Sequence, residues 1–349
     1  MKMPTINWWD RLNDRVPDLS DIKLWLGDAG VMVKLAILTV FLVFAGYTSL
    51  FVWQYEIEDE LDIAPNPKFV VQGGSQTIAM LATVIDRQSQ ETTWAPNKGA
   101  LFYIYPVAFS NNMTSYQMGV HHAVANVALG VHKLLGKDQG SSAEDEMLTK
   151  AVGRFNTDPT EWNVVKTAPG EYQTGIAYIM DFNRRVGTGQ AKITDDAKSL
   201  ASFLRDYVSN DLGGASAILE PIILQPSDVT ENARTFMSPE AKRRLSSNWG
   251  YFDTNATEPF FLTKGKLYAY YNILMAVGTD YEARLKERGA WDNWQNMLMS
   301  LRVGASMDRF FVANGEKDDT FTPQHVAVMG FSLLRADKQI REIAAIMEK

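Results

Sequence analysis

The chain has 349 residues, of which 46% are apolar and 21% are charged, a composition typical of a folded protein rather than a disordered one. It contains no cysteine, which excludes disulfides, thiolate metal sites and a cysteine nucleophile. Residues 1–34 hold five basic and five acidic side chains, so the formal net charge of −7 belongs to the rest of the chain. Such an acidic surface argues against nucleic acid as a partner, because phosphates are bound mainly through Lys and Arg.

An uncharged, apolar run extends from Leu35 to Trp53 and is rich in Leu, Val, Phe and Ile. Roughly 20 apolar residues in a helix cross the hydrocarbon core of a bilayer, so the run predicts a transmembrane anchor whose partner is lipid. A buried core helix of a soluble protein is the alternative, but such helices rarely lack a polar face over this length. The run is too long for a cleaved signal peptide and no small-x-small site follows it, which predicts an uncleaved signal anchor.

Basic residues on the two sides of the run predict its orientation. Arg15, Lys23 and Lys34 precede it within about 20 residues, whereas only Lys68 follows it within that distance. By the positive-inside rule, residues 1–34 are cytoplasmic and the main domain is periplasmic, at the inner membrane of a bacterium. Residues 1–34 also carry apolar side chains at helical spacing, which indicates an amphipathic segment that lies on the inner leaflet or binds a partner.

Residues 54–74 are predicted to form an acidic juxtamembrane linker. We expect a solvated stalk, with a divalent-cation site as the alternative. The prolines and glycines at the end of this segment precede Ser75, a suitable N-cap, so the helical periplasmic domain is expected to span residues 75–349. The acids of the linker are Glu56, Glu58, Asp59, Glu60 and Asp62.

Helix signals recur along residues 75–349, and no alternating run is long enough for a major sheet. The expected fold class is therefore all-α, with one N-terminal transmembrane helix followed by a large multi-helix domain with little or no sheet. Cap and charge signals place a further helix start at Ser238-Pro239-Glu240. The other helices are expected over residues 75–90, 115–135, 194–213 and 267–288, and from residue 322 to the end.

The segments between these helices are expected to be loops, around residues 137–142, 155–171, 212–237 and 313–321. The third is the best candidate for a boundary between two halves of the domain, although residues 218–224 are too apolar for a free linker. The aromatic stretch 101–109 contains Pro106, which argues against a central strand, so we expect a buried loop or a short edge segment there.

The four histidines are His121, His122, His132 and His325. His121 and His132 share one helical face but lie roughly 16 Å apart along it, so one metal ion cannot bridge them. The chain has no H-E-x-x-H motif, which would place two zinc ligands one turn apart. We therefore expect histidines at the rim of the core and no metal site. For His325, a catalytic role is the alternative to a structural one.

A cell-wall glycosidase would suit a helical domain outside the membrane, and it would need two carboxylates across a sugar-binding cleft. Glu161-Trp162 and Glu171-Tyr172 place an acid beside an aromatic ring, but this pairing is common in proteins of every class. The chain lacks a G-x-S-x-G motif, a phosphate loop and a dinucleotide fingerprint, so no catalytic residue and no cofactor are assigned. The aromatic stretches 268–271 and 291–294 are expected in the core, with a partner surface as the alternative.

Several short motifs accompany the anchor: Gln72-Gly73-Gly74-Ser75-Gln76, the Trp-x-Pro-Asn turn at residues 94–97, Asn111-Asn112-Met113 and Tyr116-Gln117-Met118-Gly119. In this combination the chain resembles an uncharacterised proteobacterial family, a domain of unknown function, of single-pass inner-membrane proteins with a helical periplasmic domain. The resemblance supports the location and offers no catalytic residues. We expect a non-enzymatic protein that binds or scaffolds partners in the cell envelope. The alternative is a membrane-tethered peptidoglycan hydrolase that uses a carboxylate pair.

Overall fold

The computed structural model describes residues 30–54, 57–96, 107–138, 144–163, 165–223, 231–239, 242, 254–309, 312–315 and 323–349. The chain divides into two units, Met1–Gln54 and Tyr55–Lys349. The first unit contains α3 (Val31–Gln54), a helix of 24 residues. Within the described residues, no helix was found that is both long enough and apolar enough to cross a membrane. The predicted amphipathic segment spans residues 1–34, of which residues 1–29 lie outside the described residues.

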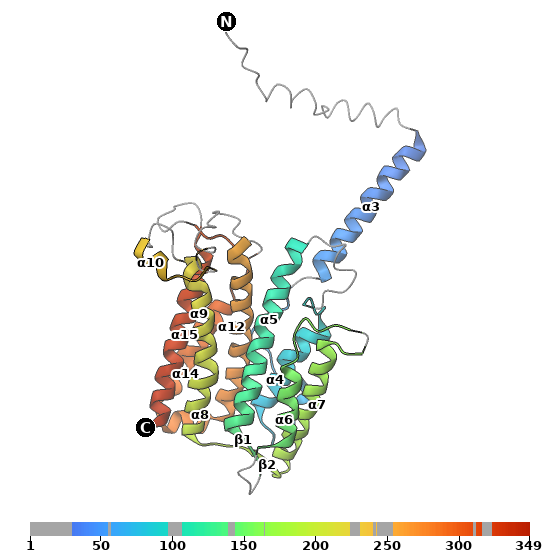
Figure 1. Ribbon diagram of the computed structural model, residues 1–349. Coiled ribbons are helices and arrows are strands. Elements are labelled where there is room, and N and C mark those ends of the chain that lie inside the picture. Colours follow the sequence, from blue (N-terminus) through green and yellow to red (C-terminus); the bar gives the residue numbers. More distant parts are fainter. Residues whose placement is uncertain are drawn as a thin grey trace. The chain divides into compact units, whose positions relative to one another are not determined.

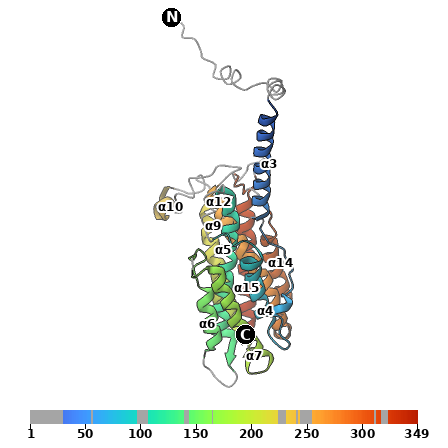
Figure 2. The same ribbon diagram turned by 90° about the vertical axis from the view of Figure 1, so that its right-hand side faces the viewer.

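The second unit is a bundle of helices (Figures 1 and 2). Its described sheet is a single antiparallel pair, β1 (Gly136–Asp138) with β2 (Ala191–Ile193), in which Gly136 lies opposite Ile193. The all-α prediction for this unit is therefore confirmed. Its longer helices are α4 (Gln76–Asp86), α5 (Val107–Gly130), α6 (Glu146–Phe155), α7 (Ala168–Gly187), α9 (Asn210–Ile223), α12 (Thr254–Asp280), α14 (Trp291–Ala305) and α15 (His325–Glu348).

Shorter helical segments connect these. They are η1 (Pro67–Phe69), η2 (Arg87–Glu91), η4 (Val131–Leu135), α8 (Ala197–Phe203), η5 (Leu204–Ser209), α10 (Glu231–Phe236) and α13 (Glu282–Glu287). Three of them, η2, η4 and η5, are π-helical turns that continue α4, α5 and α8.

Local cap chemistry explains where several helices begin and end. The hydroxyl of Ser75 accepts the backbone N–H of Ile78 at the start of α4, as the sequence predicted. The carboxylate of Asp196 accepts the backbone N–H of Ser199 at the start of α8. The helix that continues α5 ends before Gly136, also as predicted, although α5 begins at Val107 rather than near residue 115. Of the aromatic stretch expected to be a loop or edge, residues 101–106 lie outside the described residues and residues 107–109 are helical.

Tertiary packing overrides local signals at one place. The predicted helix end at Gly213-Gly214 is wrong, because α9 continues to Ile223 and includes Pro221. The apolar side chains of Leu212, Ala215, Leu219 and Ile222 are all buried, and α9 packs against α15. Burial of this face outweighs the low helix propensity of glycine, roughly 1 kcal/mol per residue.

The acidic segment after α3 is packed against the domain and is not the solvated stalk that we expected. Ile63 and Phe69 are buried, and Asp59 forms an ion pair with Lys264, a lysine that is only 1% exposed. Asp62 binds Arg302 at 2.7 Å. Acids that follow an apolar run are thus held by basic side chains from distant helices, which sequence spacing does not reveal.

Candidate functional site

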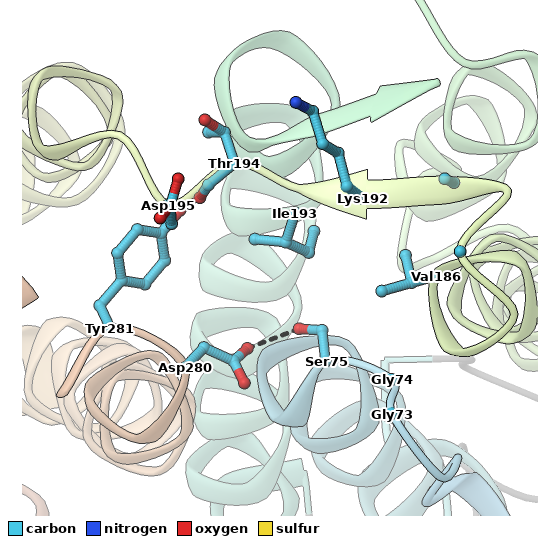
Figure 3. A pocket seen from close by; sticks show the side chains of 12 residues that line it. Gly73, Gly74, Ser75, Val186, Lys192, Ile193, Thr194, Asp195, Asp280 and Tyr281 are labelled. Atoms are coloured by element: carbon cyan, nitrogen blue, oxygen red, sulfur yellow. Dashed lines mark hydrogen bonds between the residues drawn. The ribbon is translucent and has the colours of Figure 1, made fainter. Parts of the chain in front are cut away.

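The first candidate is a cavity of about 380 Å³ between the start of α4, the end of α12 and β2 (Figure 3). Asp280 lies at its edge and points toward the first turn of α4. Its carboxylate accepts hydrogen bonds from the Ser75 hydroxyl at 2.6 Å and from the Thr77 hydroxyl at 2.8 Å. The backbone N–H groups of Gln76 and Thr77 also donate to it, each at 3.0 Å. Asp280 therefore caps α4 with its acceptor sites filled, which is a structural role.

Two glycines form the turn that precedes α4 at the edge of this cavity. Gly73 has a φ of +73°, a conformation that favours glycine. At Gly74, a Cβ atom would lie 2.8 Å from the Oδ1 atom of Asn183, which accepts the Ser75 backbone N–H at 2.8 Å. The Gly-Gly-Ser motif is thus explained by the turn into α4 and by contact with α7. Gly189 also lines the cavity; it follows the end of α7 and has a φ of +73°.

The second candidate is an open groove of about 650 Å³ along α5, which brings together His121, His122, Asp158 and Asp211. His121 is 5% exposed; its Nε2 atom lies 2.8 Å from the carbonyl oxygen of Phe155. Burial lowers the pKa of His121 to about 4, so its imidazole is neutral at physiological pH. The side chain of His122, which also lines the groove, is exposed. The expectation of histidines at the rim of the core is met on α5.

The two carboxylates of this groove do not form an acid–base pair of the kind a glycosidase uses. Asp211 accepts from Lys266 Nζ at 2.6 Å and from the Tyr270 hydroxyl at 3.0 Å. Asp158 accepts from the hydroxyl and the backbone N–H of Thr160, and these bonds lower the pKa of Asp158. A general acid needs a raised pKa, so Asp158 is unsuited to that role.

The remaining sequence candidates occupy separate places. His132 contacts Glu144, with Nε2 3.2 Å from the carboxylate. His325 Nδ1 accepts the backbone N–H of Ala313 at 3.0 Å, which fixes the turn before α15 and leaves no free base. Glu171 pairs with Arg154. Among the described residues, no group of three or more His, Asp or Glu side chains could hold a metal ion.

The aromatic candidates divide into core and surface. Tyr268, Tyr270 and Trp294 are fully buried, so the prediction that these stretches belong to the core is confirmed for them. Tyr172 is also buried and donates its hydroxyl to the carbonyl oxygen of Thr157 at 3.1 Å. By contrast, Trp162 is 55% exposed. Burial thus separates Trp162 from the other rings, and no local sequence signal marked it out.

The polar residues that organise the described fold were missed at the sequence level. Asp280, Asn183 and Lys264 each bind a group far away in the chain, 205 residues away for the contact between Asp280 and Ser75. No spacing rule connects such partners.

These features define a helical protein whose best-formed polar sites, over the described ranges, serve to hold the fold. The chain belongs to a family described as "uncharacterized protein conserved in bacteria (DUF2333)", whose model matches residues 28–349. No curated protein and no solved structure matches the chain.

Proposed function

We propose that this protein is anchored in the bacterial inner membrane by α3 and that its helical domain binds or scaffolds partners of the cell envelope from the periplasmic side. The observation that carries the proposal is the exposure of α3. Five consecutive apolar residues, 40–44, are each more than half exposed, including Val40 at 69% and Phe44 at 67%. Successive helical residues are rotated by about 100°, so this apolar surface surrounds the helix.

A helix that is apolar on all sides is stable when lipid covers it. The 24 residues of α3 extend about 36 Å, enough for a hydrocarbon core of about 30 Å. The described side chains of α3 end at residue 46, and the uncharged sequence continues to Trp53. The family match begins at residue 28 and so includes α3, which supports a role for the helix beyond that of a removable leader.

A partner-binding role is supported by an apolar face on α14 and α15. The Ser300 hydroxyl donates to the side chain of Gln339 at 2.6 Å, so these helices lie side by side. A Cβ atom on Gly304 would lie 3.4 Å from the Cβ atom of Ser332, so the segments that carry Val303 and Phe331 are neighbours. Met299 and Val303 are exposed one turn apart on α14, and Phe331 is 68% exposed on α15. Exposed apolar patches of this kind often mark interaction surfaces. The absence of an acid–base pair in the α5 groove favours binding over hydrolysis.

The orientation can be tested with single cysteines, because the natural chain has none. Gln190→Cys places a thiol on an exposed turn of the domain, and Thr5→Cys places one before α3. With the outer membrane permeabilised, a membrane-impermeant maleimide should label position 190 in intact cells and position 5 only after lysis. Labelling at position 5 alone would contradict the periplasmic assignment, and release of the protein by alkaline carbonate would contradict the anchor.

The partner surface can be tested with a photo-crosslinking amino acid at Phe331. We expect a discrete adduct with one envelope protein, and we expect Val303→Asp to weaken it by placing a charge within the same apolar face. The same crosslinker at Gln190 is the matched control and should give no such adduct. A clean monomer with no adduct from position 331 would count against the scaffold proposal.

A further inference from the structure

The floor of the α5 groove is a single stripe along α5. Its lining side chains recur at helical spacing over about 16 Å of the helix, so they share one face. Near the middle of the stripe is Ala125, whose side chain is a single methyl group, and its small size leaves the floor hollow. The stripe consists of Met118, His121, His122, Ala125, Asn126 and Leu129.

His121 and Asn126 form the two edges of this stripe. Five residues turn an α-helix by about 500°, so these two side chains point about 140° apart around α5. The Nε2 atom of His121 contacts the end of α6 through the carbonyl oxygen of Phe155 at 2.8 Å. The side-chain amide of Asn126 contacts η5 through the carbonyl oxygen of Tyr207. The segment after α6 and the start of α9 supply the remaining lining of the groove.

Each edge residue keeps a hydrogen-bond acceptor that the fold does not use. A carbonyl oxygen can only accept, so Nε2 of His121 carries the proton and Nδ1 keeps a lone pair. This Nδ1 atom is buried and has no partner among the described residues. Asn126 donates its amide hydrogens to Tyr207 and, at 3.0 Å, to the Tyr270 hydroxyl, so its Oδ1 atom remains to accept. Because buried polar groups are nearly always hydrogen-bonded, the Nδ1 atom calls for a donor.

Asp158 adds a third acceptor from the segment after α6. Both hydrogen bonds from Thr160 end on its Oδ1 atom, at 2.7 and 2.8 Å, and no described residue bonds to Oδ2. The other carboxylate of the groove, that of Asp211, is balanced by the ammonium of Lys266 at 2.6 Å. The groove therefore combines an excess of acceptors with one uncompensated negative charge, which disfavours an anionic ligand.

We propose that the α5 groove binds an uncharged oligosaccharide whose hydroxyl groups donate to these three acceptors. The inference rests on the proposed binding role of the domain and assigns that role a ligand. Met118, Leu129 and Pro159 offer apolar surface for the C–H faces of sugar rings, between the polar groups that fix their orientation. The groove holds the sugar without cleaving it, because Asp158 cannot serve as the general acid.

A cationic ligand would fit this groove less well than a sugar. An ammonium group can also donate to the three acceptors. However, desolvation and then the charge of Lys266 lower the pKa of His122, so the charge of Lys266 acts within the groove. Lys266 is only 6% exposed, and little water screens it. A ligand ammonium beside His122 would be repelled, whereas a hydroxyl group would not.

Nuclear magnetic resonance of the imidazole Cε1–H groups tests the site directly, because the chain has four histidines. Two of them line the groove, and His132 and His325 do not. The full chain is kept in a detergent without a sugar headgroup and titrated separately with maltotetraose and with tetra-N-acetylchitotetraose. We expect saturable shifts of the His121 and His122 signals with at least one sugar, and none at His132 or His325. The sugar that binds identifies the ligand as a glucan or as an N-acetylated glycan.

Two substitutions attribute the binding to the groove. Asp158→Asn keeps an oxygen for Thr160 and replaces the free acceptor by a donor, so we expect the dissociation constant to rise about tenfold. Ala125→Leu fills the floor of the groove and should abolish the shifts. Asp292→Asn, at an exposed carboxylate on α14, is the control and should leave the dissociation constant unchanged. Unaltered His132 and His325 signals show that each variant is folded.

Several results would overturn the inference. They are no saturable shift with either sugar, binding that Asp158→Asn or Ala125→Leu leaves unchanged, and shifts with putrescine when neither sugar binds, which would make the ligand a cation. Each of these would remove the sugar site and leave the anchor and the α14–α15 face to the labelling and crosslinking tests. Conversely, labelling that contradicts the periplasmic assignment would change the source of the sugar and not the affinity of the groove.

Discussion

Gly119 of α5 and Gly265 of α12 face each other in a reciprocal contact between the two helices. A Cβ atom on Gly119 would lie 2.0 Å from the carbonyl oxygen of Leu262, and one on Gly265 would lie 2.0 Å from that of Tyr116. Backbone thus packs directly on backbone at this crossing, and no flexible side chain is available to move aside. The motif Tyr116-Gln117-Met118-Gly119 is explained by this contact, since its glycine admits α12 and its tyrosine carbonyl meets Gly265.

Replacing either glycine by alanine should push α5 and α12 apart. We expect Gly119→Ala and Gly265→Ala each to lower the free energy of unfolding by about 1–3 kcal/mol or more, because overpacking strains a filled core. Chemical denaturation of the detergent-solubilised chain measures this. Gly214→Ala is the matched control: nothing lies within 4 Å of its Cβ position, so helix propensity should stabilise it by roughly 0.5–1 kcal/mol. Equal effects at all three positions would contradict the close crossing.

The ion pair between Asp59 and Lys264 should be the most sensitive contact of the acidic segment. Asp59→Asn leaves a lysine charge that is 1% exposed without its counter-ion, and we expect a loss of about 3 kcal/mol in stability. Glu60→Gln is the control, because Glu60 is 70% exposed and its pair with Arg87 should contribute less than about 1 kcal/mol. Combining Asp59→Leu with Lys264→Met should restore much of the loss. A double variant as unstable as the single one would show that the charges themselves are required.

The carboxylate of Asp280 should stabilise the start of α4 from across the domain. Asp280→Ala removes the acceptor for four donors, and we expect a loss of about 2 kcal/mol together with faster hydrogen exchange at Gln76 and Thr77. Asp292→Ala, in the exposed first turn of α14, should change stability by less than about 0.5 kcal/mol. Unchanged exchange at Gln76 and Thr77 would refute the capping role.

The α5 groove should not hydrolyse peptidoglycan, because Asp158 is held ionised and Asp211 is bonded to Lys266 and Tyr270. Incubation of the full chain in mild detergent with purified sacculi should release no soluble muropeptides above a buffer blank. Should fragments appear, Asp158→Asn and Asp211→Asn identify whether this groove produces them. Fragment release that either substitution abolishes would favour the hydrolase over the scaffold.

The sequence predicts the described fold well where the signal is local and poorly where it is not. Ser75 and Gly136 act on neighbours within five residues, and the helix boundaries expected from them agree with the structure. The helix expected from residue 194 begins at Ala197, because the side chain of Asp196 provides its N-cap. The pairing of Asp59 with Lys264 depends on which helices meet, so the same acids were expected to face water. Composition alone cannot distinguish a solvated acid from one that binds a buried lysine.

Predictions about the site follow the same division. The spacing of His121 and His132 predicted that they lie apart along one continuous helix, and α5 with η4 places them so, since spacing along a helix is a local property. Trp162 and Tyr172 each follow a glutamate, yet Trp162 is exposed and Tyr172 is buried. The difference arises because Trp162 lies in the turn that is bridged to Thr167, whereas Tyr172 lies on the packed face of α7. A sequence pattern that is common to both rings cannot predict which ring is exposed and which is buried.

Burial of His121 should make the domain less stable in acid. The folded state holds its pKa near 4, below the value of about 6.5 in an unfolded chain, so the unfolded chain binds more protons between these two values. The stabilisation is full above about pH 6.5 and is lost as the pH falls toward 4, by up to about 3 kcal/mol. His121→Gln, which can still donate to the carbonyl oxygen of Phe155, should flatten the dependence of unfolding free energy on pH in this window. His122→Gln is the comparison at the neighbouring position: desolvation and then the charge of Lys266 lower the pKa of His122 as well, so this variant should flatten the slope less than His121→Gln does. If the two variants keep the same slope as the natural chain, protonation of His121 does not drive acid unfolding.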